Sequence, residues 1–185
     1  MDAPGTPVQQ LPGQRPLVLT LGLDTLGQAR FDGERKRYYP ARLNRIPAHV
    51  SLFHALPGKE EASIRLELEK LADRTALFPV EVYDLMRLGR GVAYAVRASQ
   101  LDELHARLRA AWLPWLTRQD GQPFRPHIVV QNKVDPGEAR ALYERLSSAF
   151  RPWTVEATGF LLWHYEGGPW SPAGEFRFSA GIGEP

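Results

Sequence analysis

Two apolar segments near the middle of the chain, at about 79–87 and 91–97, are separated only by a turn at Gly89-Arg90-Gly91. So short a connection joins antiparallel strands, because parallel strands need a crossover of about a dozen residues or more. Other apolar runs alternate with segments of helical periodicity. Hairpins together with helical crossovers predict an α+β fold with largely antiparallel sheets rather than a doubly wound parallel sheet.

The remaining elements follow from the same two periodicities. Strands are expected at about 17–23, 48–55, 126–133, 153–165 and 175–180, and helices at about 60–77, 100–112 and 135–149. A helix within residues 24–45 is weakened by Gly27 and Gly33. The basic side chains from Arg30 to Arg45 form either a solvated helix face, which we favour, or a surface for RNA phosphates.

The composition narrows the class of protein. A length of 185 residues suffices for one domain or two small lobes, and a net charge of +2 is too small to attract nucleic acid without a local patch. The lack of cysteine excludes disulfides, thiolate zinc sites and a cysteine nucleophile, and it fits a cytoplasmic protein. No stretch reaches the roughly 18 apolar residues of a membrane span. We expect a disordered, proline-rich tail without a signal peptide over residues 1–16, and one two-lobed domain over residues 17–185.

Two of the expected strands begin with a histidine that follows a proline. The first segment reads Pro47-Ala48-His49-Val50-Ser51-Leu52, and the second reads Arg125-Pro126-His127-Ile128-Val129-Val130. Side chains alternate between the two faces of a strand, so the strictly apolar face of each segment belongs to the core. The opposite face then carries His49, Ser51 and Phe53 in the first strand and His127, Val129, Gln131 and Lys133 in the second.

This pair of segments resembles the signature of the two-histidine (2H) phosphoesterase superfamily, a repeated His-x-Ser/Thr-x in which x is apolar. Within the superfamily, the chain resembles the bacterial proteins related to the 2′-5′ RNA ligases and cyclic phosphodiesterases, from about Leu17 to Ala180. The resemblance implies two pseudo-symmetric lobes whose antiparallel sheets line a central cleft, with helices outside. The first copy is complete in His49 and Ser51, whereas the second carries Val129 in place of the hydroxyl residue.

The resemblance also implies a reaction, the opening of a 2′,3′-cyclic phosphate on an RNA end or a nucleotide to a 2′-phosphate, with no metal and no cofactor. The same steps with a 5′-hydroxyl as the nucleophile would give 2′-5′ RNA ligation. Histidine suits this chemistry because it titrates near neutrality, so one imidazole accepts a proton while the other donates one. The sequence leaves open which of His49 and His127 is the base. We expect a monomer, with no protein partner and no membrane association.

Other residues of the two segments are candidates for binding the substrate. Ser51 would hold a nonbridging phosphate oxygen, and Gln131 or Lys133 would replace the hydroxyl that is missing at Val129. Arg125 either stabilises charge at the phosphate or is only a surface charge.

Two other functions stay open. One is a 3′-end RNA exonuclease of the same superfamily, and the other is a noncatalytic RNA- or nucleotide-binding module, which the valine at position 129 makes credible. Phe53 would either stack a base or pack between the lobes. We expect His54 on the core side of its strand or at the strand end, and His105 at a helix surface. The aromatic residues around Trp163 are more typical of a core than of a base-stacking platform. A zinc site lacks the spacing for a third ligand.

Overall fold

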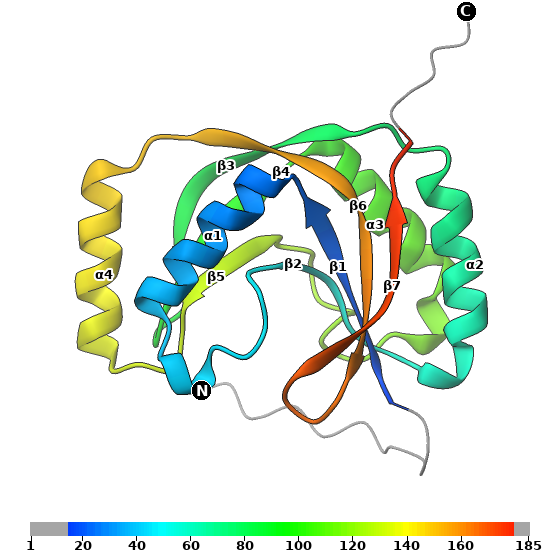
Figure 1. Ribbon diagram of the computed structural model, residues 1–185, viewed down its shortest axis with the longest axis horizontal. Helices are drawn as coiled ribbons and strands as arrows, with labels where there is room; N and C mark the ends of the chain where they lie inside the picture. Colours follow the sequence, from blue (N-terminus) through cyan, green and yellow to red (C-terminus); the bar gives the residue numbers. More distant parts are fainter. Residues whose placement is uncertain (1–14, 180–185) are drawn as a thin grey trace, which may run out of the picture.

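The computed structural model describes residues 15–179, in which an antiparallel sheet is flanked by four helices (Figure 1). The strands are β1 (Leu17–Leu23), β2 (Val50–Leu56), β3 (Phe78–Arg87), β4 (Val92–Arg97), β5 (His127–Gln131), β6 (Trp153–Tyr165) and β7 (Trp170–Arg177). The helices are α1 (Thr25–Tyr38), α2 (Glu61–Ala72), α3 (Ser99–Ala111) and α4 (Pro136–Ala149), with short 3₁₀ turns η1 (Ala41–Leu43), η2 (Gly58–Glu60) and η3 (Leu113–Trp115). The expected tail falls almost wholly on residues 1–14, which lie outside the described residues. Over residues 15–179, no helix is both long and apolar enough to cross a membrane.

Most elements lie within a few residues of their expected positions, and the differences have local causes. α1 forms over Thr25–Tyr38 despite its two glycines, because the Asp24 carboxylate caps its start and accepts a hydrogen bond from the Gly27 N–H at 2.9 Å. β7 begins at Trp170 instead of about residue 175, because Trp170 pairs with Tyr165, the last residue of β6. This early start extends the β6–β7 hairpin.

The seven strands form one continuous antiparallel sheet in the order β1-β2-β5-β4-β3-β6-β7, and β1 also pairs with β6. The sheet closes on itself because β6 is 13 residues long. Its first half, from Trp153 to Ala157, pairs with β3, whereas its second half pairs with β1 and β7. The closure creates two groups of strands, one containing β1, β2 and β7 and the other containing β3, β4 and β5.

These two groups are the expected lobes, and the α+β class with antiparallel strands is confirmed. The lobes are not separate sheets, however. They are continuous through β6 and meet a second time where β2 lies beside β5. That second junction is narrow, because β2 and β5 pair only through Val50 and Ile128.

Helices cover the outside of both lobes (Figure 1). α1 and α4 contact the lobe of β3, β4 and β5, whereas α2 contacts β6 and β7. α3 covers β2, because the ring of His105 stacks on Phe53 with ring centroids 4.9 Å apart and on Phe124 with centroids 3.7 Å apart. His105 is only 5% exposed, so the expectation of a surface histidine is wrong. It is a core residue between two aromatic rings.

Candidate active site

The two histidine motifs lie side by side at the narrow junction between the lobes. Val50 and Ile128 are paired across β2 and β5, and both are fully buried. Alternation along each strand then puts His49, Ser51, His127 and Val129 on the other face, where all four are partly exposed. The predicted division into a core face and an open face is therefore confirmed for these four residues.

The register interlocks the two motifs. Because the strands are antiparallel and Val50 faces Ile128, Ser51 lies opposite His127 and His49 lies opposite Val129. The two histidines are diagonal neighbours, for which an antiparallel ladder gives a separation of about 7–8 Å. The third residue of each motif thus faces the histidine of the other motif.

Both imidazoles are held by the same backbone contact. The Nδ1 atom of His49 lies 2.8 Å from the carbonyl oxygen of Pro47, and the Nδ1 atom of His127 lies 2.7 Å from the carbonyl oxygen of Arg125. A carbonyl oxygen only accepts hydrogen bonds, so Nδ1 carries the proton in each ring. The Nε2 atoms are left for a substrate, one from each lobe.

Three side chains of α1 fix the segment that precedes β2. Asp32 accepts a hydrogen bond from the Ala48 N–H at 2.7 Å, and Gln28 donates to the Ala48 carbonyl oxygen at 2.9 Å. With Arg35, these residues recur every three or four positions and so share one helix face. The polar face of α1 is thus turned toward the backbone next to His49 instead of being solvated along its whole length. The expectation of a solvated face is therefore wrong for Arg35.

Arg35 joins the two motifs. Only 4% of this residue is exposed. Its Nε donates to the Asn44 side chain at 2.8 Å and to the Ile46 carbonyl oxygen at 3.2 Å, and its Nη1 donates to the Val129 carbonyl oxygen at 2.8 Å. Burial lowers the pKa of the guanidinium. One sign of this role is visible in the sequence, the helical spacing from Gln28 and Asp32, which cannot by itself separate a buried arginine from a surface one.

His49 differs from His127 because an aromatic ring packs on its imidazole. The ring of Trp170, at the start of β7, lies over the His49 ring with centroids 4.7 Å apart. Burial lowers the pKa of His49 from 6.5 to about 4, the Pro47 carbonyl opposes this by raising it, and the nearby charges of Arg35, His54 and His127 lower it further. The His49 imidazole is therefore neutral at pH 7.

A hollow of about 300 Å³ opens beside His49. Its walls come from β1, α1, β6 and β7, and they include Gln28, Thr158 and Trp163. The Trp163 indole N–H donates to the Thr20 hydroxyl at 2.9 Å, and its ring lies 6.1 Å from that of Trp170. Trp163 and Trp170 thus line one side of the histidine site instead of joining the core.

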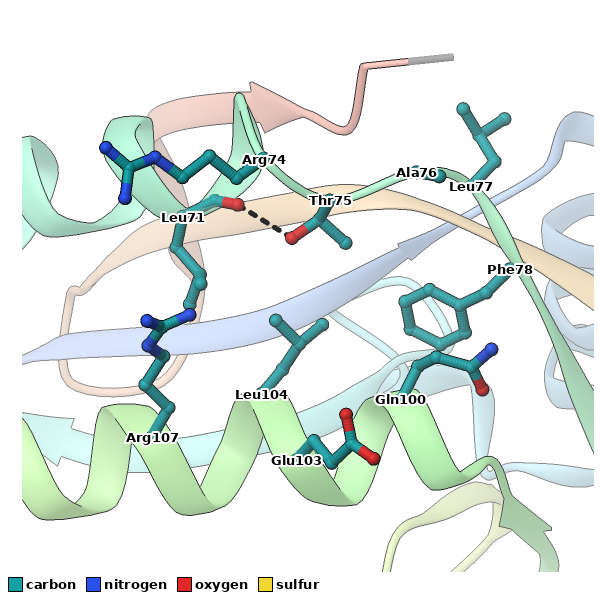
Figure 2. Close-up of a pocket in the computed structure, with 10 residues that line it drawn as sticks. All are labelled: Leu71, Arg74, Thr75, Ala76, Leu77, Phe78, Gln100, Glu103, Leu104 and Arg107. Atoms are coloured by element: carbon teal, nitrogen blue, oxygen red, sulfur yellow. Dashed lines mark hydrogen bonds between the residues drawn. The ribbon is translucent and has the colours of Figure 1, made fainter. Parts of the chain in front are cut away.

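A second hollow of similar size lies elsewhere on the molecule, between the end of α2 and α3, and Figure 2 shows the side chains that line it. Arg74 and Arg107 contribute guanidinium groups, and the Thr75 hydroxyl donates to the Leu71 carbonyl oxygen at 2.7 Å. Its lining includes neither of the motif histidines. It is not part of the histidine site.

Gln131 and Lys133, which were expected on the open face beside Val129, are not placed there by β5. β5 ends at Gln131, whose side chain is buried at 3% exposure, with its Nε2 at 3.4 Å from Glu138 and its Oε1 unpartnered. Lys133 lies beyond the strand with a φ of 61°, so strand alternation no longer places its side chain. Arg125 is exposed just ahead of β5. Within residues 15–179, no three His, Asp or Glu side chains are arranged to hold a metal ion.

A β-bulge exchanges the expected places of Phe53 and His54. Thr20 of β1 faces Ser51, but the preceding Leu19 faces Phe53, so β2 contains one extra residue at this point. Phe53 is consequently turned into the core, fully buried against His105, while His54 is exposed on the other face. Phe53 is not available to stack a base. The face that carries His49 and Ser51 continues with His54.

The family model described as the 2′-5′ RNA ligase superfamily matches residues 23–169. Protein TT0787 of Thermus thermophilus has a similar fold, with a TM-score of 0.64 and 19% identity over 90% of this chain and 99% of its own. LigT of Escherichia coli complexed with 3′-AMP gives a TM-score of 0.58 and 17% identity over 90% and 99% of the two chains. The same protein complexed with phosphate gives 0.54 and 18% over 89% and 98%. No curated protein matches the chain in sequence.

Proposed function

The chain belongs to the 2′-5′ RNA ligase superfamily, and we propose that it hydrolyses the 2′,3′-cyclic phosphate of an RNA end or nucleotide to a 2′-phosphate without a metal ion. One observation carries this proposal. Two imidazoles from opposite lobes share one face, and each is held through Nδ1 so that its Nε2 is free. A reaction that needs one proton acceptor and one proton donor at the same phosphate uses such a pair.

The environment of the two rings supports an assignment of roles. His49 is the general base, because burial keeps its imidazole neutral and its Nε2 lone pair available at neutral pH. It takes a proton from water as the water oxygen forms a bond to phosphorus. The bond from phosphorus to the ribose 3′ oxygen breaks, and protonated His127 donates its Nε2 proton to that oxygen. Ser51, opposite His127, donates its hydroxyl hydrogen bond to a nonbridging oxygen.

The same groups support ligation in place of hydrolysis. With a 5′-hydroxyl of another RNA end in place of water, His49 and His127 would give 2′-5′ ligation by the same two proton transfers. Nucleotides are suitable ligands for such a site, and crystal structures of E. coli LigT, which has a similar fold, contain 3′-AMP and ATP. A binding module without turnover is the second candidate, because the missing hydroxyl of Val129 lies directly opposite His49.

Hydrolysis of adenosine 2′,3′-cyclic phosphate, followed by ³¹P NMR in the presence of a chelator, tests the proposal. We expect conversion to the 2′-phosphate and a fall in kcat/KM of at least about 100-fold in His49→Ala and in His127→Ala. The control is His164→Ala, because the Nε2 atom of His164 is hydrogen-bonded to the Glu61 carboxylate of α2 at 2.9 Å and contacts neither motif histidine through this bond. Tight binding with no product would favour the binding module. Full activity in His127→Ala would overturn the assignment of the site.

A further inference from the structure

We propose that His54, oriented by the buried carboxylate of Asp120, binds a second phosphate of the substrate, the one on the 5′ side of the reacting nucleotide. This inference rests on the proposed function and names the substrate class more closely. The site would then prefer the end of an oligonucleotide, or a 5′-phosphorylated nucleotide, over a nucleoside cyclic phosphate.

The first step is the position of His54. The bulge in β2 puts this side chain on the face of His49 and Ser51, with 42% of it exposed. Two residues of the bulge count as one step of the ladder, so His54 lies about 7 Å from Ser51 along the strand. This distance is of the order of the span of one nucleotide. Its charge is close enough to His49 to lower the pKa of His49.

The second step is the way Asp120 holds the ring. One oxygen of Asp120 accepts hydrogen bonds from the backbone N–H of His54 at 2.9 Å and from its Nδ1 at 2.8 Å. The other oxygen accepts from the Ala55 N–H and from the Thr117 hydroxyl, each at 3.2 Å. Burial alone would raise the pKa of Asp120, but these hydrogen bonds lower it below 3.8, so the group is a carboxylate. The carboxylate fixes the ring and leaves Nε2 directed away from Asp120.

The third step is the choice of ligand. A phosphate completes this pair, because a phosphate oxygen accepts a hydrogen bond from Nε2 while Asp120 accepts the one from Nδ1. Arg125 supplies a further positive charge at the same end. β2 and β5 are antiparallel, so the direction from Ser51 to His54 is also the direction from His127 back toward the exposed Arg125.

The test compares kcat/KM for adenosine 2′,3′-cyclic phosphate, for the same compound with a 5′-phosphate, and for a dinucleotide ending in a cyclic phosphate. We expect the protein to prefer both phosphorylated substrates by about tenfold or more. In His54→Ala this ratio falls to about one, whereas in His164→Ala, which also removes a histidine bonded to a carboxylate, the ratio is kept. Asp120→Asn lowers the ratio less than His54→Ala does.

Three results would overturn the inference. The first is a ratio near one in the unaltered protein, and the second is an unchanged ratio in His54→Ala. The third is a preference for the dinucleotide without one for the 5′-phosphorylated mononucleotide, which would mean that His54 contacts a nucleoside. The ratio of the binding constants of the 2′-phosphate products with and without a 5′-phosphate tests the same preference without turnover. Absence of turnover would therefore refute the proposed function while the second phosphate site is still tested by binding.

Discussion

At the scale of single residues, the two histidines share a backbone contact but differ in their cover. His49 lies under Trp170, and burial is the main cause of its low pKa. Since the neutral form acts as the base, kcat/KM should fall only as the pH drops toward about 4. We expect Trp170→Ala to expose the ring and to move this acid limb upward, toward the ordinary value of 6.5.

The pH dependence of kcat/KM and an NMR titration of His49 both measure this effect. Tyr165→Ala is the control, because Tyr165 belongs to the same hairpin and is 37% exposed. An acid limb that stays near pH 4 in Trp170→Ala would show that the rest of the site, rather than this ring, keeps His49 neutral.

Val129 is the second residue-scale difference, because the first motif has a hydroxyl at the matching position. Threonine has nearly the shape of valine, and position 129 is only partly buried, so Val129→Thr adds a hydroxyl opposite His49 without burying it. A hydrogen bond to a charged phosphate is worth about 1.5–3 kcal/mol, which predicts a gain in kcat/KM of about tenfold or more. Val129→Ile adds bulk without a hydroxyl and should give no gain. Equal rates in the two variants would mean that the site makes no use of a donor there.

At the scale of elements, much of the site follows from periodicity. The division of β2 and β5 into a core face and an open face near the motifs needs only alternation, so the sequence predicted the face on which His49, Ser51 and His127 lie. The bulge at Phe53 was not predicted, because strict alternation assumes that each residue advances the strand by one step, whereas a bulge inserts an extra residue. The sequence feature that matches the bulge is the pair of neighbouring apolar residues Leu52 and Phe53 followed by the polar His54. The backbone N–H of His54, just after the bulge, is bound by Asp120, 66 residues away, which local periodicity cannot indicate.

Helix α1 is a second case that periodicity does not resolve. Some of its basic residues are exposed to solvent, whereas Arg35 is buried against the backbone of the site. Arg35→Met would leave the carbonyl oxygens of Ile46 and Val129 without their donor, and a lost partner of this kind costs about 1–3 kcal/mol. We expect a loss of that size in the free energy of unfolding, together with a lower kcat because both motif segments lose their shared anchor. Urea unfolding and kinetics measure the two effects.

The exposed Lys36 is the matched position on the same helix. Lys36→Met removes a neighbouring cation and should leave both stability and kcat nearly unchanged. If Lys36→Met weakened RNA binding while Arg35→Met had no effect on turnover, α1 would be an RNA-phosphate surface, which is the alternative interpretation of this basic segment.

At the scale of the whole molecule, the fold class followed from element order, but the closure of the sheet did not. The long β6 was expected at about its observed length, yet nothing local indicates that its two halves take different partners. Pairing between distant strands is decided by how the whole core packs, for example by Phe160 and Phe31, both fully buried. The closure matters for the site because it brings β2 and β5 together at a single residue pair.

A ligand held by both histidines therefore bridges the lobes where their own pairing is weakest. Binding to the folded protein alone should stabilise the whole molecule, and adenosine 2′-monophosphate at about 100 times its Kd adds about 2.7 kcal/mol. For a domain of this size, that predicts a rise in Tm of about 5–10 °C by calorimetry. The double variant His49→Ala, His127→Ala should lose the rise. The variant Arg74→Ala, Arg107→Ala, which alters the other hollow (Figure 2), should keep it. The opposite pattern would mean that the nucleotide binds between α2 and α3, and that the junction of the lobes is not its site.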